Sequence, residues 1–146
     1  MGGGSIVETI RKDFSSHAFI ELVDIDTDVI AIATSEFGID RYSGISLVQS
    51  DVWVFMQNCN RSYDIIIVDL FVIDTVPHVF TSFDFIQFLH DHLNPVGSVL
   101  YNTMRETLGR TTFENIKKGF DELKFQVIVL ERVWEVNDLI IAKKLV

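Results

Sequence analysis

The stretch FIELVDID, residues 19–26, is a hydrophobic run that ends in acids, as expected of a β-strand followed by a turn. Three consecutive glycines, Gly2, Gly3 and Gly4, precede it, and Asp24 stands 20 residues after Gly4. Glycines let a backbone approach a ligand closely, and an acid at the end of the next strand can bind a ribose. The spacing therefore predicts a nucleotide-type site. A glycine loop of this kind normally follows a strand, and almost nothing precedes this one, so we expect the first strand of the sheet to be largely missing.

The remaining hydrophobic pattern alternates between strands and helices. Expected strands cover residues 19–25, 45–48, 65–68, 98–101, 125–130 and 139–142, and expected helices cover residues 5–14, 28–37, 52–58, 82–93 and 113–123. This alternation predicts an α/β protein with a doubly wound, mostly parallel sheet, helices on both faces and a C-terminal antiparallel strand.

Local signals refine several of these elements. Ser5 and Glu8 have the spacing of a capping box at the start of the first helix, and Thr81 is the expected cap of the helix at residues 82–93. The segment NPVG, residues 94–97, predicts a turn. The β-branched run IIIV, residues 65–68, predicts a strand that is buried on both faces.

The composition is that of one folded domain, expected to span residues 1–146. Nearly half of the residues are apolar and twelve are Phe, enough for a sizeable core. The net charge of −9 disfavours contact with a phosphate backbone, so we expect no nucleic-acid partner. No apolar run has the length of a membrane span and no export signal is visible, and the lone Cys59 favours a reducing, cytoplasmic location. The Phe excess on the helix at residues 82–93 leaves a homodimer contact open.

Four acids fall at or just past the ends of expected strands: Asp24, Asp26, Asp51 and Asp69. Ligands of parallel sheets bind beyond the carboxyl ends of the strands, so we expect these acids to gather along one edge. Alternative interpretations stand beside this one. Asp26 and Asp51 also have the position of helix caps, Asp69 that of a turn acid, and the glycine run that of a flexible tail.

Four motifs in order resemble a known family. They are VDIDTDVI at residues 23–30, Ser50 with Asp51, YDIIIVD at residues 63–69, and NPVG at residues 94–97. Together they resemble the Rossmann-like S-adenosylmethionine-dependent methyltransferases, and within them the spermidine synthase branch. In that family the first strand is central. The resemblance therefore implies a chain that is incomplete at its N-terminus, or one in which another segment fills that place.

The resemblance also implies roles for individual residues. The glycine run would lie against the amino-acid end of S-adenosylmethionine, or of its decarboxylated form, while Asp24, with Ile25 beside it, would accept hydrogen bonds from the ribose hydroxyls. Asp51 would accept from the adenine amino group, with the Val52 amide near the ring. Asp69 would stand at the reaction centre, where a carboxylate helps to deprotonate the acceptor.

Two departures from the family favour methyl transfer to a small-molecule acceptor of unknown identity. Ser5 stands where spermidine synthases carry the acid that binds the cationic aminopropyl end of their donor. Residues 70–73 read LFVI where those enzymes carry S-S-D-P. A polyamine aminopropyltransferase is one alternative, and a non-catalytic domain that binds a ligand or partner is another.

Two further kinds of site find little support. A NAD-dependent oxidoreductase needs a third glycine, at the position of Val7. His90 and His92 are two residues apart on an expected helix and point to different faces, and no Cys/His cluster has zinc spacing, so we expect no metal site.

Overall fold

A computed structural model describes residues 4–133 and 135–145. Within it the chain forms two compact units, Met1–Cys59 and Asn60–Val146. None of the described helices is both long enough and apolar enough to cross a bilayer.

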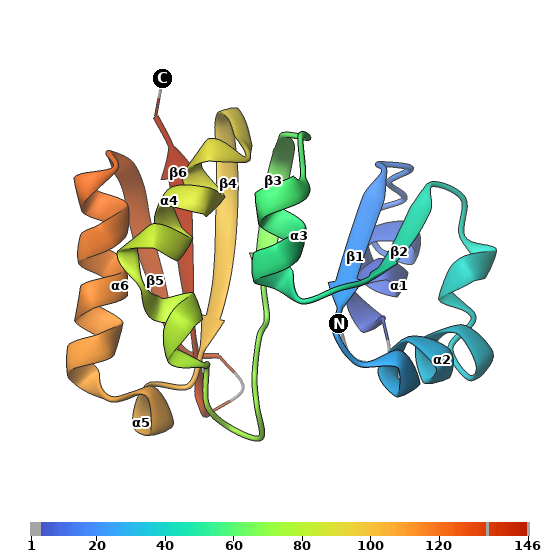
Figure 1. Ribbon diagram of the computed structural model, residues 1–146, viewed down its shortest axis with the longest axis horizontal. Coiled ribbons are helices and arrows are strands. Elements are labelled where there is room, and N and C mark those ends of the chain that lie inside the picture. Colours follow the sequence, from blue (N-terminus) through green and yellow to red (C-terminus); the bar gives the residue numbers. More distant parts are fainter. Residues whose placement is uncertain (1–3, 134, 146) are drawn as a thin grey trace. The chain divides into compact units, whose positions relative to one another are not determined.

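The first unit is built on a parallel pair of strands (Figure 1). Its elements are α1 (Ser5–Lys12), β1 (Ile20–Asp24), α2 (Thr27–Ser35), the 3₁₀ helix η1 (Ile39–Arg41), β2 (Ile45–Gln49) and α3 (Val52–Asn58). The pairing runs from Ile20 opposite Ile45 to Asp24 opposite Gln49, so both strands end at the same level. Each expected strand and helix of this segment is therefore confirmed, with ends shifted by a few residues.

The start of α1 differs from the expectation. Its N-cap is Gly4, which has a left-handed φ of +80°, and Ser5 is already the first helical residue. No side-chain capping bond forms, and Glu8 pairs instead with Lys12 one turn later. The capping box expected for Ser5 and Glu8 is wrong, because a residue inside the helix can no longer act as its cap.

The second unit contains a four-stranded mixed sheet in the order β3-β4-β6-β5. Its elements are β3 (Tyr63–Val68), η2 (His78–Thr81), α4 (Phe83–Asp91), β4 (Leu93–Thr103), α5 (Arg105–Leu108), α6 (Arg110–Glu122), β5 (Phe125–Val133) and β6 (Asn137–Lys144). β3 and β4 are parallel, whereas β6 is antiparallel to both of its neighbours. The antiparallel pairing expected for the last two strands is confirmed. β1 and β3 are each an edge strand of their sheet.

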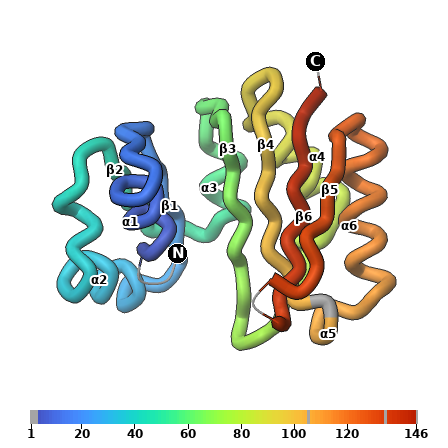
Figure 2. Tube along the Cα trace, turned by 180° about the vertical axis from the view of Figure 1, so that it is seen from behind, coloured from blue at the N-terminus to red at the C-terminus, as the bar shows by residue number. Residues whose placement is uncertain are grey.

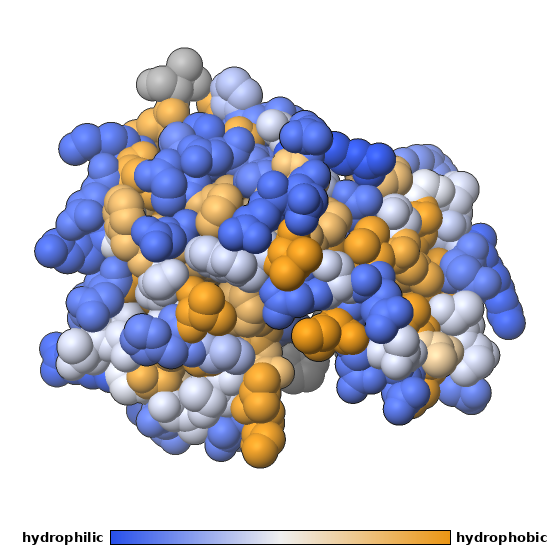
Figure 3. Space-filling model, in the orientation of Figure 1, coloured by the Kyte–Doolittle hydropathy of each residue, from blue (hydrophilic) through white to orange (hydrophobic). Residues whose placement is uncertain are grey.

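Helices α4 and α6 cover one face of this sheet (Figures 1 and 2). Their apolar sides supply Phe85, Ile86, Leu89, Phe113, Ile116 and Phe120, which are buried against Val99, Tyr101, Ile140 and Ala142 of the strands. On the solvent side of these helices, hydrophilic side chains dominate the surface (Figure 3). Gly119 marks the closest approach, because a Cβ atom there would lie 2.6 Å from Cδ1 of Ile86.

The other face of the sheet carries apolar residues in register. Ile67, Leu100, Ile141 and Ile128 stand opposite one another across all four strands. Ile65 and Ile67 are 60% and 41% exposed, so the expectation that residues 65–68 are buried on both faces is wrong. The reason is that α4 and α6 cover only the face to which Val68 points, where that side chain is 3% exposed.

Two local expectations in this unit are also corrected. Ser82, rather than Thr81, caps α4, because its Oγ accepts from the Phe85 amide at 3.3 Å. The turn expected at residues 94–97 is a bulge inside β4. The register jumps there between Tyr63 and Ile65, and Val96 has a φ of +60°.

The end of α4 is held by polar contacts. Lys144 Nζ donates to the carbonyls of His90 and Leu93 at 2.9 and 3.1 Å. Burial raises the pKa of the Asp91 carboxyl, but hydrogen bonds with His90 and Gln87, both at 2.9 Å, outweigh it and lower the pKa of Asp91 overall.

Candidate functional site

The ends of β1 and β2 bring two of the expected site acids to one edge of the first unit. The Ser50 amide donates to the main-chain carbonyl of Asp24 at 2.9 Å, immediately after the last pair of the ladder. Asp51 follows at once and begins α3. The prediction that Asp24 and Asp51 share the carboxyl edge of a parallel sheet is therefore confirmed within this unit.

Asp24 is half-buried, and a hydrogen bond within the turn that follows β1 holds its side chain. Its Oδ1 accepts from the Asp26 amide at 3.0 Å. Asp26 in turn caps α2, accepting from the amides of Asp28 and Val29 at 2.8 and 3.4 Å. The alternative interpretation of Asp26 as a helix cap is thus what the structure shows. Ile25 lies between the two acids in the sequence and is 65% exposed, so it presents apolar surface next to Asp24 in the chain.

Asp51 caps α3 through a single oxygen. Its Oδ1 accepts from the amides of Trp53 and Val54 at 2.7 and 3.2 Å. Because both bonds use the same atom, capping leaves the second oxygen of the carboxylate to accept from another donor. Val52, half-buried, is the first residue of the helix. The capping role and the expected ligand role of Asp51 are therefore compatible.

The glycine run is described only at Gly4, since Gly2 and Gly3 lie outside the described residues. Gly4 is buried, and the side on which other residues carry Cβ is filled by Ile39 of η1. Its carbonyl accepts from the amides of Val7 and Glu8 at 2.9 and 3.2 Å. The left-handed φ and the tight contact both require glycine at this position.

In the second unit, Asp69 follows β3 and is exposed. Its Oδ1 accepts from Nδ2 of Asn102 at 2.9 Å, and Oδ1 of Asn102 accepts from Nδ2 of Asn137 at 2.8 Å. Because Asn137 donates to the Asn102 oxygen, the amide nitrogen of Asn102 must face Asp69. Neither asparagine was predicted from the sequence. Asn102 stands one residue past the strand expected at residues 98–101, and this position at a strand end is the signal that could have found it.

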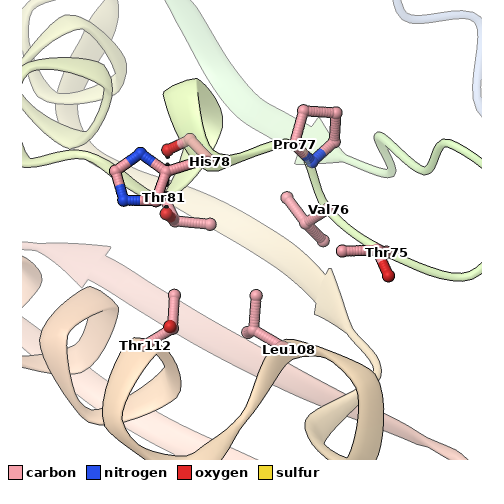
Figure 4. A pocket seen from close by; sticks show the side chains of 7 residues that line it. All are labelled: Thr75, Val76, Pro77, His78, Thr81, Leu108 and Thr112. Carbon is pink, nitrogen blue, oxygen red and sulfur yellow. Dashed lines mark hydrogen bonds between the residues drawn. The ribbon is translucent and has the colours of Figure 1, made fainter.

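A pocket of about 220 Å³ lies between the segments that follow β3 and β4. It is lined by Thr75, Val76, Pro77, His78, Thr81, Leu108 and Thr112 (Figure 4). Among the described residues, no group of three or more His, Cys, Asp or Glu side chains could hold a metal ion.

The chain is similar to a family model and to several solved structures. The family model for the spermine/spermidine synthase domain matches residues 2–132. The chain belongs to the spermine/spermidine synthase family. The match runs across both units and confirms the resemblance inferred from the four motifs.

Solved structures of similar fold include human Methyltransferase-like protein 13 in complex with SAH, with a TM-score of 0.84 and 21% identity over 99% of this chain and 68% of that one. A probable spermidine synthase from Corynebacterium glutamicum has a TM-score of 0.81 and 16% identity, over 97% of this chain and 53% of that one.

A methyltransferase from Pyrococcus furiosus has a TM-score of 0.74 and 17% identity, over 97% of this chain and 69% of that one. The chain thus spans about half to two thirds of the length of these proteins. They confirm the expected doubly wound α/β fold of the class I methyltransferases. Among the curated proteins, none matches the chain.

Proposed function

We propose that this protein is an S-adenosylmethionine-dependent methyltransferase of the spermidine-synthase-like group, acting on a small-molecule acceptor. The observation that carries the proposal is the pair of carboxylates, Asp24 and Asp51, at the ends of neighbouring parallel strands. Family membership over residues 2–132 supports treating both units as parts of one S-adenosylmethionine-binding domain.

The residues at this edge suit the adenosine part of the donor. A ribose presents two hydroxyl donors and adenine one amino donor, and carboxylates are pure acceptors. Asp24 would take the ribose hydroxyls, with Ile25 beside it as apolar contact surface. Asp51 would take the adenine amino group through the oxygen that capping leaves over, with Val52 beside the ring. Gly2, Gly3 and Gly4 would adjoin the amino-acid end.

When bound, the donor supplies a methyl group whose bond to the sulfonium sulfur breaks with both electrons passing to sulfur, as a lone pair of the acceptor forms the new bond to carbon. The acceptor then loses a proton. Asp69 is our candidate to accept it, because the carboxylate is exposed and one of its oxygens is held by Asn102 at 2.9 Å. Most of the rate enhancement would come from orientation of the two reactants.

Aminopropyl transfer is the second candidate, favoured by family membership itself. Against it stand Ser5 and the apolar residues 70–73, where a cationic substrate needs acids. Turnover with decarboxylated S-adenosylmethionine and putrescine would decide for this candidate.

A non-catalytic domain that binds a ligand or partner is the third candidate function. We further propose a cytoplasmic location from the lone Cys59, and no nucleic-acid partner from the net charge of −9.

Isothermal titration with S-adenosylhomocysteine, the product, tests the proposal. We expect micromolar binding that Asp24→Ala abolishes without unfolding the protein. Binding that survives Asp24→Ala would place the ligand elsewhere. A folded protein that binds neither the product nor the donor would support the non-catalytic alternative.

A further inference from the structure

The pocket in the second unit stands where sheets of this type bind ligands. Residues 75–81 follow the carboxyl end of β3, and α5 and α6 follow the carboxyl end of β4. In the close view, His78, Thr81 and Pro77 line one side, and Leu108 and Thr112 face them from the helices (Figure 4). The volume of about 220 Å³ has room for about seven water molecules.

The walls of the pocket are held in place by the protein itself. Residues 72–75 form a small hairpin closed by two backbone hydrogen bonds of 2.9 and 3.2 Å. The Thr107 hydroxyl of α5 donates to the Asp74 carbonyl in this hairpin at 2.5 Å. On the far side, the buried Tyr101 hydroxyl donates to the Phe80 carbonyl at 2.5 Å. The pocket is therefore formed before any ligand enters, which reduces the ordering cost of binding.

The polar groups of the pocket mostly offer acceptors. The hydroxyl of Thr81 already donates to the His78 carbonyl at 2.9 Å, and that of Thr75 donates to Oδ1 of Asp74 at 3.2 Å. Each hydroxyl has thus used its proton and keeps its lone pairs. The His78 ring and the Thr112 hydroxyl have no hydrogen-bond partner within residues 4–133 and 135–145. Thr75 and Thr81 can only accept from a ligand, whereas the Thr112 hydroxyl and a neutral His78 ring can each accept and donate. A ligand with hydroxyl groups, which also do both, would satisfy all four groups.

The lining of the pocket disfavours one class of ligand. None of its seven residues is a carboxylate, and the adjoining Asp74 already accepts from Thr75 at 3.2 Å. Val76, which is 3% exposed, forms an apolar wall with Pro77 and Leu108. A diammonium ligand would lose hydration there without meeting an opposite charge, which is costly.

A second hollow of about 350 Å³ shares His78, Thr81 and Thr112 and continues along α6. The one carboxylate of its lining, Glu122, has Lys118 Nζ at 3.5 Å, so that charge is already paired. The two hollows together leave room for an acceptor larger than the small pocket.

We propose that this pocket binds an uncharged, hydrogen-bond-donating part of the acceptor, that His78 and Thr112 contact it, and that polyamines are not its ligands. The proposal rests on the transferase function proposed above, because it gives the pocket the role of acceptor site. It adds the substrate class to that function.

The test uses two probes of equal length, butane-1,4-diol and putrescine, added at millimolar concentration to the ¹⁵N-labelled full chain. We expect butane-1,4-diol to shift amide signals of residues 75–81 and 108–112, and putrescine to leave them unchanged. Thr112→Arg fills the pocket and should weaken diol binding at least tenfold. Thr111→Arg is the matched control, since Thr111 is exposed and lines neither hollow.

A second variant covers the case in which Thr112→Arg fails to fold. His78→Ala removes an exposed ring and should weaken diol binding about fivefold, the equivalent of one hydrogen bond. Putrescine binding at these residues, an absence of shifts with the diol, or equal effects of the two arginine variants would each overturn the proposal. Titration with S-adenosylhomocysteine is run on the same samples. Its failure would refute the transferase function while the probe result still decides the ligand class of the pocket.

Discussion

Replacing Asp51 by Asn separates the two roles of this side chain. The Asn Oδ1 can still accept from the amides of Trp53 and Val54, so the cap of α3 is kept. Only the favourable contact of a negative charge with the helix N-terminus is lost, at about 0.3–1 kcal/mol. The second oxygen, however, becomes an NH₂ group. If it faces the adenine amino group, a donor then meets a donor.

The expected loss of affinity follows from that change. A hydrogen bond to a charged group contributes about 1.5–3 kcal/mol, which corresponds to a roughly 10- to 150-fold rise in Kd for S-adenosylhomocysteine. Isothermal titration measures the Kd, and thermal denaturation measures the stability of the same samples.

The matched control is Asp26→Asn. Asp26 caps α2 with the same pattern of two amides on one oxygen, at 2.8 and 3.4 Å, but has no expected ligand contact. Both variants should therefore show the same small loss of stability, and only Asp51→Asn should lose affinity. Equal affinity of both variants and the parent would show that Asp51 is a helix cap and nothing more. Equal loss in both would show that the effect is structural.

Three further predictions concern stability and are measured by denaturation. Gly119→Ala should gain about 1 kcal/mol of helix propensity but lose about 1–3 kcal/mol to overpacking against Ile86. In an Ile86→Val background, which removes the clashing Cδ1 atom, we expect the change in stability caused by Gly119→Ala to be at least about 1 kcal/mol less unfavourable. Additive effects of the two substitutions would contradict this coupling. Gly4→Ala combines a left-handed φ with a blocked Cβ position and should cost at least about 2 kcal/mol, so an unchanged midpoint would refute the packing described here. Because the pKa of Asp91 is lowered in the folded protein, its carboxylate contributes stability above about pH 4, and this stability is lost as the pH falls through the folded-state pKa. Asp91→Asn should therefore make the free energy of unfolding fall less steeply with decreasing pH in the acid range. An unchanged pH dependence in that range would exclude the contribution of Asp91.

Much of the fold was predictable because its signals are local. The strand at β1 and the helices α2 and α3 follow from hydrophobic periodicity and from acids at capping positions, which act over three or four residues. Placing Asp24 and Asp51 on one edge needed only the rule that parallel strands end together. The failures near helix starts are of the same local kind. Ser5 and Thr81 each lost the cap to an adjacent residue, and neighbouring positions cannot be told apart by pattern alone.

The polar contacts of the second unit were not predictable in the same way. Asn102 meets Asp69 across 33 residues of sequence, and His78 shares a pocket with Thr112. These partners depend on strand pairing and on where α5 and α6 begin after β4, which no short-range pattern encodes. The exposure of Ile65 likewise depends on which face the helices cover.

By itself, therefore, the sequence determined the order of strands and helices, the acids at the strand ends and the family. Periodicity, capping and motif spacing are properties of neighbouring residues, and they act before distant segments meet. Only the tertiary structure decided that the Asn102 amide donates to Asp69 and which threonine hydroxyls have already donated their protons. It also decided which face of the second unit's sheet the helices leave exposed. These depend on strand register and on helix packing. A shift of one residue in a strand would turn its side chains to the opposite face of the sheet, and a shift in a helix would rotate its side chains around the axis.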